Sequence, residues 1–306
     1  MSQAPDISFK SWLMVAVLGF TWGGTFLVTE VALEGLTPFW LAAGRIGFAA
    51  VLMMAIWAGL GFKLFDDPVP RGTWGAACLI GALSSAVPFM LLAWGQQFVT
   101  SGFAGVSMAA VALIVLPLAH FLVPGERLNL RKGLGFIIGF FGVCVLIGAQ
   151  AFETTGASME PAGRLACLGA ATCYAVSSIL MRRLPPVDTI GLSTVLLLIG
   201  ALLVIPLALA VEGLPPMPDT KTLIVVIMLG LIPTAAANLL RVLVVRTAGP
   251  VFMSLTNYQV PLWSVVLGAL LLGEPLPPSL LWAMVLILSG VALSQYGALM
   301  RLFRNG

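Results

Sequence analysis

The side chains that could bind a polar molecule lie inside apolar segments of this chain, close to prolines. Asn257 and Tyr258 come just before Pro261 in one such segment. Asn238 and Arg241 lie three residues apart in another, so they would share one face of a helix. Amide and hydroxyl side chains, with carbonyls freed at kinks, can satisfy a carboxylate and an ammonium without a fixed buried charge. Tyr and Trp rings would suit an aromatic group by stacking.

Prolines occur at roughly matching places in the two halves of the chain. Pro88 has a rough partner in Pro233, and Pro117 has one in Pro261. A proline inside a helix removes one amide donor and frees a carbonyl one turn earlier. In lipid such groups need partners, so these places usually face protein or water. Any single proline is equally well explained as a structural kink, but the matched set favours a cavity.

We expect the substrate cavity to be lined from the first, third, fourth, sixth, eighth and ninth apolar segments. The expected lining residues are Trp22, Thr25, Pro88, Trp94, Ser107, Met108, Tyr174, Ser177, Asn238, Arg241, Asn257, Tyr258 and Pro261.

For each polar residue of this set the alternative is a hydrogen bond between helices. Arg241 has a second alternative, because its long side chain could reach the cytoplasmic interface. Arg45 lies within the second segment, where we expect Glu30 to pair with it as a structural clasp or outer gate. Glu126 and Glu274 are expected to cap helix starts, where the helix dipole favours a negative charge.

The composition points to a membrane as the solvent of this chain. Of 306 residues, 60% are hydrophobic and 9% are charged, whereas a soluble domain is about 25% charged. The four cysteines all lie in apolar runs and are interpreted as small buried hydrophobes. With a single histidine, His120, a multi-histidine metal site is excluded. The net charge of +3 gives no indication of nucleic-acid binding.

Ten stretches are apolar and long enough to cross a bilayer, which takes about 20 residues. They are Trp12–Leu33, Pro38–Leu60, Thr73–Trp94, Gly102–Val123, Lys132–Ala149, Gly163–Met181, Thr189–Val211, Thr222–Val245, Pro250–Leu272 and Ser279–Met300. The fold class is therefore an all-α membrane protein with ten transmembrane helices.

The positive charges predict that both termini lie in the cytoplasm. Lys and Arg accumulate in cytoplasmic loops. With ten spans, eleven of them fall on the cytoplasmic side, and only Arg164 and Lys221 fall outside.

A repeated motif predicts that the two halves are related. Gly125-Glu126 and Gly273-Glu274 each follow an apolar segment, and five matching positions share a separation of 148 residues. Each half has five spans, so the second half enters the membrane from the opposite side. Inverted repeats are frequent in secondary transporters, which hold substrate near the midplane. We expect a first five-helix repeat over 1–150, an external linker over 151–162 and a second, inverted repeat over 163–306.

The motifs resemble the EamA-type branch of the drug/metabolite transporter superfamily. The resemblance is carried by Thr21-Trp22-Gly23, by the stretch from Ala42 to Arg45, and by the Gly-Glu pairs that close the fourth and ninth segments. It implies a ten-helix exporter of small metabolites in a bacterial inner membrane. Among such proteins the chain looks most similar to bacterial aromatic amino acid exporters. Arg45 departs from the repeat, because the second half has no counterpart to it.

The sequence therefore predicts a multi-pass transporter with no cofactor, no metal and no catalytic residues. Its partners would be a small-molecule substrate, an amino acid or similar metabolite, and the lipid bilayer. We expect a monomer, with a dimer as the alternative. Other open interpretations are a membrane-embedded enzyme or lipid-handling protein, an exporter of other amphiphilic metabolites or drugs, and a channel.

Overall fold

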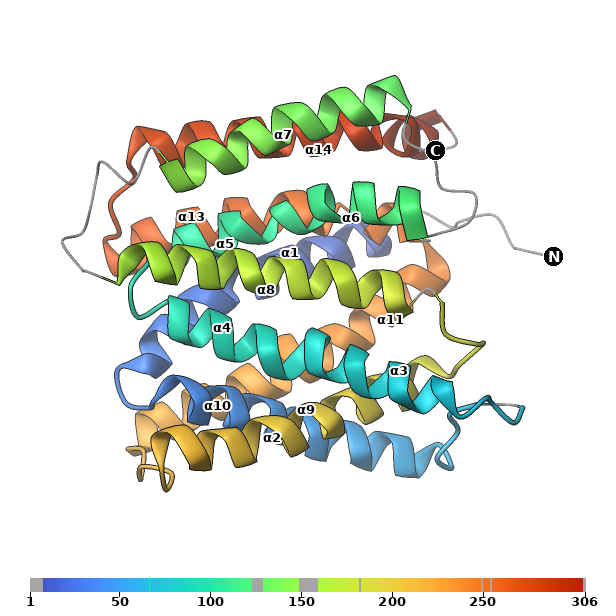
Figure 1. Ribbon diagram of the computed structural model, residues 1–306, viewed down its shortest axis with the longest axis vertical. Coiled ribbons are helices and arrows are strands. Elements are labelled where there is room, and N and C mark those ends of the chain that lie inside the picture. Colours follow the sequence, from blue (N-terminus) through green and yellow to red (C-terminus); the bar gives the residue numbers. More distant parts are fainter. Residues whose placement is uncertain are drawn as a thin grey trace. The chain divides into compact units, whose positions relative to one another are not determined.

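The computed structural model describes residues 8–65, 67–122, 129–148, 159–181, 183–248, 250–253 and 255–304, and every regular element in these ranges is helical (Figure 1). The first half of the chain contributes α1 (Phe9–Leu33), α2 (Pro38–Gly59), α3 (Gly72–Gly81), the π-helical turn η1 (Ala82–Ala86), α4 (Val87–Gly95), α5 (Ser101–Met108), α6 (Ala110–Leu122) and α7 (Leu130–Gly148). The second half contributes α8 (Glu160–Met181), α9 (Thr189–Glu212), α10 (Thr220–Leu229), the π-helical turn η3 (Gly230–Ala236), α11 (Ala237–Thr247), α12 (Pro250–Met253), α13 (Thr256–Leu272) and α14 (Pro278–Arg304). The all-α class is confirmed.

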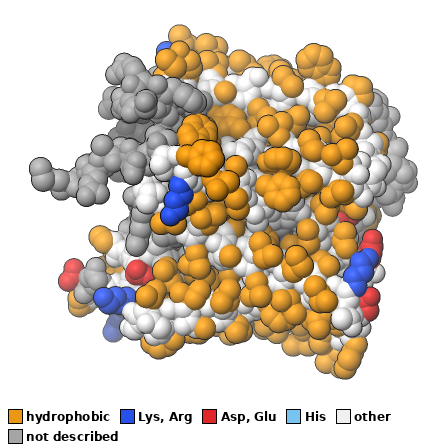
Figure 2. All heavy atoms as spheres, turned by 180° about the vertical axis from the view of Figure 1, so that it is seen from behind, with side chains coloured by type: hydrophobic (Ala, Val, Ile, Leu, Met, Phe, Trp, Pro, Cys, Tyr) orange, Lys and Arg blue, Asp and Glu red, His pale blue; other side chains and the backbone are white. Residues whose placement is uncertain are grey.

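Seven spans in the described part of the chain are long and apolar enough to cross a membrane. They are Phe9–Leu33, Pro38–Gly59, Gly72–Gly95, Ser101–Leu122, Glu160–Met181, Thr189–Glu212 and Thr220–Arg241. The other three predicted spans correspond to α7, whose second and third residues are basic, and to the shorter apolar stretches Thr256–Leu272 and Pro278–Ser294. The count of ten therefore stays a prediction. Hydrophobic side chains cover most of the face drawn in Figure 2, as a lipid-facing surface requires.

The helices form two compact units. Unit 1 comprises residues 1–27, 100–161 and 239–306, and unit 2 comprises residues 28–99 and 162–238. Each unit thus takes helices from both halves of the sequence. The two predicted repeats, 1–150 and 163–306, were defined by sequence and expected topology, whereas the units are defined by contacts. The repeats therefore stay a prediction. Gly125, Glu126 and most of the predicted linker lie outside the described residues.

Polar side chains define several helix starts. Asp188 accepts a hydrogen bond from the N–H of Gly191, and Asp219 accepts one from Thr222, each at 2.8 Å. The hydrogen bonds from Thr222 lower the pKa of Asp219, which lies outside the spans. A depressed pKa in the folded protein means that this cap is present at neutral pH and is lost as the pH falls through that pKa.

Close helix contacts in unit 1 occur where glycine leaves room. On α1, a Cβ added at Gly19 would lie 2.5 Å from Gln259 of α13, and one at Gly23 would lie 2.5 Å from Trp263. On α7, a Cβ at Gly135 would lie 2.5 Å from the carbonyl oxygen of Gly290 on α14. Figure 1 shows α7 lying along α14. The GxxxG spacings therefore serve packing inside the chain, the use that small residues commonly have in membranes.

The Gly-Glu motif at the end of α13 caps a different helix. Gly273 has φ +67°, which turns the chain sharply. Glu274 then accepts hydrogen bonds from the N–H groups of Ser101 and Gly102 at 2.8 and 3.0 Å, at the start of α5. Thr100 accepts one from the next N–H, that of Phe103. The expected capping role of Glu274 is confirmed, because the first turn of α5 has no other acceptors for these donors.

Unit 2 contains the same device at the start of α2. Glu212, the last residue of α9, accepts hydrogen bonds from the N–H groups of Phe39 and Trp40 at 3.0 and 3.1 Å. It also accepts one from the hydroxyl of Thr37 at 2.6 Å. This cap was not predicted from the sequence, although Glu212 stands directly before Gly213 and so reverses the order of the Gly-Glu motif.

Replacing the Glu274 carboxylate should destabilise the fold. Glu274→Ala leaves two N–H groups at the start of α5 without acceptors, and a hydrogen bond to a charged group contributes about 1.5–3 kcal/mol. We expect a loss of roughly 2–4 kcal/mol, measured by thermal unfolding of the purified protein in detergent.

Glu34→Ala is the matched control, since the exposed Glu34 forms a surface ion pair with Lys221 at 3.2 Å. Such pairs contribute at most about 1 kcal/mol. Equal unfolding temperatures for the two variants would contradict the capping role.

Candidate functional site

Three helical segments of unit 2 contribute groups toward Arg45, a residue of α2 whose side chain is 9% exposed. Its Nε–H donates a hydrogen bond to the hydroxyl of Thr234 in η3 at 2.8 Å. Its guanidinium carbon lies 4.1 Å from the centre of the Phe89 ring on α4. The phenol of Tyr174 on α8 lies within electrostatic range of the guanidinium. We call Arg45, Phe89, Tyr174, Thr234 and Asn238 the Arg45 cluster.

Thr234 belongs to the cluster because of the proline beside it. Pro233 has no N–H, so it leaves the carbonyl of Leu229 without its usual helical donor. The Thr234 hydroxyl donates to that carbonyl oxygen at 2.8 Å and accepts from Arg45 at the same time. The kinked backbone of η3 is thus tied directly to α2. Gly230 allows this approach, because a Cβ there would lie 2.9 Å from the carbonyl oxygen of Arg45.

Pro88 marks a second distortion. The π-helical turn η1 ends one residue before α4, and Pro88 is the second residue of α4. Pro88 and Pro233 thus each lie at a π-helical turn, which is a frequent cause of bends and is common at functional sites. The prediction of matched distortions in the third and eighth segments is confirmed. Pro88 itself is buried, and its neighbour Phe89 is the residue that contacts the guanidinium.

Two predicted site residues lie in the cluster, and a third lies beside it. Tyr174 interacts electrostatically with Arg45. Asn238 donates from Nδ2 to the carbonyl oxygen of Thr234 at 3.0 Å, which leaves its Oδ1 available as an acceptor. Ser177 is buried and donates to the carbonyl oxygen of Tyr174 on its own helix at 3.0 Å. The hydroxyl of Ser177 therefore has a local structural partner.

The expected clasp between Arg45 and Glu30 is wrong. Arg45 has no ion pair in the described part of the chain, and Glu30 instead accepts a hydrogen bond from Nε2 of Gln96 at 3.3 Å. An arginine inside a membrane without a counter-charge costs roughly 3 kcal/mol on insertion scales. Thr234 and Phe89 offset part of that cost through one hydrogen bond and a cation–π contact. The sequence analysis placed neither of these residues in the site.

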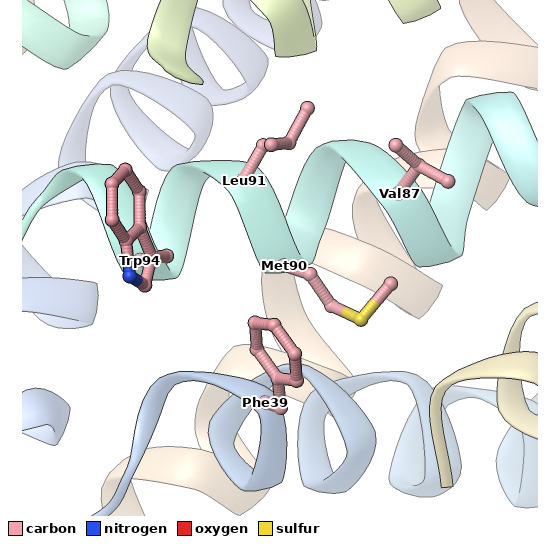
Figure 3. Close-up of a pocket in the computed structure, with 5 residues that line it drawn as sticks. All are labelled: Phe39, Val87, Met90, Leu91 and Trp94. Atoms are coloured by element: carbon pink, nitrogen blue, oxygen red, sulfur yellow. The ribbon is translucent and has the colours of Figure 1, made fainter. Parts of the chain in front are cut away.

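Trp94 lines an apolar cavity on the face of α4 opposite to Phe89. The cavity has a volume of about 230 Å³ and is lined by Phe39, Val87, Met90, Leu91 and Trp94 (Figure 3). Positions 87, 90, 91 and 94 share one side of a helix, and Phe89 points away from them. Trp94 and the Arg45 cluster therefore belong to different surfaces of unit 2.

In unit 1 the predicted residues lie on three packed helices. Trp22 and Thr25 are on α1, which contacts α13 through Gly19 and Gly23. Ser107 and Met108 are at the end of α5, which runs antiparallel to α13: Ser101 lies near Gly268, and Gly105 contacts Ser264. Continued by one turn, this register brings Met108 level with Pro261.

Local hydrogen bonds use two of the hydroxyls in this group. Thr25 donates to the carbonyl oxygen of Thr21, and Ser107 donates to that of Phe103, each at 2.9 Å. Tyr258 differs, because its buried hydroxyl has no hydrogen-bond partner among the described residues. Its neighbour Asn257 is exposed in the first turn of α13. Arg241, in the unit 1 part of α11, is also exposed.

The fourth and ninth segments are interrupted, but not at their prolines. Pro117 lies inside α6 and Pro261 lies inside α13. The interruptions come earlier, at Ala109 between α5 and α6, and between α12 and α13. Helices tolerate a mid-span proline where neighbouring groups satisfy the freed carbonyl. Met108 and Asn257 therefore lie next to breaks that the sequence analysis placed one to two turns too late.

Comparison with known proteins assigns the family. The model of the EamA-like transporter family matches the chain twice, over residues 10–148 and 161–296. The chain belongs to the EamA-like transporter family. Its members are multi-pass membrane transporters, and the double match fits the predicted two-repeat architecture.

Several EamA-like relatives carry names but no assigned substrate. The chain is 28% identical to YedA of Escherichia coli K12, an uncharacterized inner membrane transporter, with 90% of this chain and 87% of YedA covered. It is 22% identical to YoaV of Bacillus subtilis, an uncharacterized transporter, with 93% and 97% covered. A solved crystal structure shares the fold, with a TM-score of 0.66, 22% identity, and 94% and 98% covered. The names agree with transport rather than enzymatic catalysis.

The hydrogen bonds of Thr234 with Arg45 and Leu229 predict that removing its hydroxyl lowers the stability of the protein. Thr234→Val keeps the shape of the side chain but leaves Arg45 Nε without its acceptor and removes one donor from the Leu229 carbonyl. A buried unsatisfied group costs about 1–3 kcal/mol, so we expect a loss of about 1–3 kcal/mol in thermal unfolding.

Thr247→Val is the matched control. The Thr247 hydroxyl also bonds a carbonyl one turn earlier, that of Leu243 at 2.9 Å, but it is exposed and bonds no arginine. A Thr234→Val protein as stable as this control would contradict the proposed link.

Proposed function

We propose that the chain is a secondary transporter that exports small metabolites, above all amino acids including aromatic ones, from the cytoplasm. It would carry them across a bacterial inner membrane by alternating access. The observation that carries this proposal is the double family match over nearly the whole chain, together with a relative named an inner membrane transporter. Inverted repeats, which we predict for this chain, hold substrate near the midplane in secondary transporters.

The residues within each unit support a small amphiphilic substrate. Unit 1 brings Trp22, Met108 and Tyr258 onto three packed helices, and unit 2 places Phe89 and Tyr174 around a buried arginine. Aromatic rings give apolar area with a polar edge, which suits aromatic side chains. Distorted or interrupted helices accompany these residues, as is usual for transporter binding sites.

The apolar cavity lined by Trp94 favours a second candidate, an exporter of other amphiphilic metabolites or drugs. Its lining has no charged residue, so it suits an apolar portion of a ligand. A lipid-handling protein would use the same surface, and the assay below separates these alternatives.

Transport of amino acids should be measurable in reconstituted vesicles. We expect proteoliposomes loaded with unlabelled phenylalanine, leucine or threonine to accumulate the labelled amino acid several-fold above protein-free vesicles. Counterflow isolates the carrier from its energy source, because the outward gradient drives uptake of the label.

The panel also includes a lipophilic drug cation and a fluorescent phospholipid. Counterflow of the cation alone would favour drug export, and lipid movement alone would favour lipid handling. Absence of counterflow for every amino acid would overturn the proposal as stated.

Two side chains in unit 1 should affect transport without affecting folding. Asn257→Ala and Tyr258→Ala each remove a polar group that has no fixed structural partner, so the amount of folded protein should not change. Loss of one substrate hydrogen bond of about 1.4 kcal/mol would lower the counterflow rate roughly tenfold. Tyr296→Ala serves as control, since Tyr296 is 45% exposed and stacks with Arg131. Wild-type rates in both variants would remove Asn257 and Tyr258 from the site.

A further inference from the structure

Arg45 is a buried cation whose strongest donors are unused. The complete set of its bonds to the described chain is one hydrogen bond, from Nε to Thr234, and one ring contact, with Phe89. Both Nη nitrogens thus remain without a protein acceptor. The carboxylate of Glu30 in the same unit is engaged by Gln96 instead.

The guanidinium is fixed in an orientation that leaves one edge free to bind a ligand. Thr234 fixes one edge through Nε, and Phe89 covers one face at 4.1 Å. The opposite edge, which carries the two Nη groups, is the part of arginine that binds a carboxylate through two parallel hydrogen bonds. An arginine with a purely structural role would be expected to use these donors on backbone carbonyls or a carboxylate.

The surroundings fit the rest of an amino acid. The Phe89 ring lies over the guanidinium and offers apolar surface to a side chain, and Tyr174 lies within electrostatic range of the same group. Asn238 is held against Thr234 through its Nδ2, so its Oδ1 is available to accept from an ammonium group. These groups come from four helical segments of one unit, α2, α4, α8 and the stretch formed by η3 and α11.

We propose that the Nη groups of Arg45 bind the carboxylate of the exported substrate. The inference rests on the proposed function and narrows it: the substrate carries a carboxylate, and an apolar or aromatic substituent lies against Phe89 and Tyr174. Arg45 then has a counter-charge only when substrate is bound.

The experiment compares carboxylates with their neutral amides. Phenylalanine, leucine and threonine, each with its amide, and phenyl phosphate are titrated calorimetrically into the purified full chain and used as competitors of counterflow. We expect the wild type to bind each carboxylate at least about tenfold more tightly than its amide, because a bidentate charged contact is lost in the amide. Arg45→Gln should reduce that ratio to about one, and Arg45→Lys should give an intermediate ratio.

Arg131→Gln is the matched control. Arg131 also lies over an aromatic ring, with its guanidinium carbon 4.7 Å from the centre of the Tyr296 ring, but it is exposed and should leave the ratio unchanged. If Arg45→Gln fails to fold, Thr234→Val replaces it: the charge stays, the orientation is lost, and the ratio should fall several-fold.

The outcomes separate the two proposals. Carboxylate binding that depends on Arg45, without any counterflow, would overturn transport but keep this inference. If carboxylates and amides inhibit counterflow equally well, the inference about Arg45 is overturned but the proposal of transport stands. A wild-type ratio near one, an unchanged ratio in Arg45→Gln, or tighter binding of phenyl phosphate than of every carboxylate would each overturn it.

Discussion

The structure depends on one constraint: backbone N–H and C=O groups that a helix leaves unpaired must find partners where no water is present. Several side chains meet this requirement, among them Glu274, Glu212 and Thr234. Glu274 accepts from the first N–H groups of α5, and Glu212 accepts from those of α2. Thr234 donates to the carbonyl that Pro233 leaves without a donor. A buried backbone group that is left unsatisfied in an apolar surrounding costs several kcal/mol.

Because carboxylates serve as caps, Arg45 has no carboxylate partner among the described residues. Glu274 and Glu212 are committed to helix starts, and Glu30 accepts from Gln96. Of these carboxylates, Glu212 and Glu30 belong to unit 2, and each bonds to groups other than Arg45. Arg45 is held by a neutral hydroxyl and an aromatic ring, both of which leave its charge intact. A buried cation arranged in this way attracts an anion, and this links the packing of unit 2 to a ligand.

The sequence predicted the helical class, most helix bounds and the capping role of Glu274, because these follow from hydropathy and from the local preference of carboxylates for helix starts. It also located the distortions at Pro88 and Pro233. The sequence did not predict which side chains contact each other across helices. Arg45 was assigned to Glu30 by proximity along the membrane normal, yet the rotation of α2 turns it toward Thr234. Glu212 was overlooked because a single terminal carboxylate has no local pattern that shows which helix it caps.

The carboxylate caps also explain why the compact units do not follow the sequence halves. Glu274 ends a helix of the second half and caps α5 of the first, while Glu212 ends α9 of the second half and caps α2 of the first. Each cap requires the end of one helix to lie against the start of another, so it fixes a pair of helices from opposite halves side by side. Glycines at the same contacts, such as Gly268 beside Glu274, remove the side chains that would block the approach. The two caps therefore contribute to the interleaving of the halves, together with glycine contacts such as that of α7 with α14.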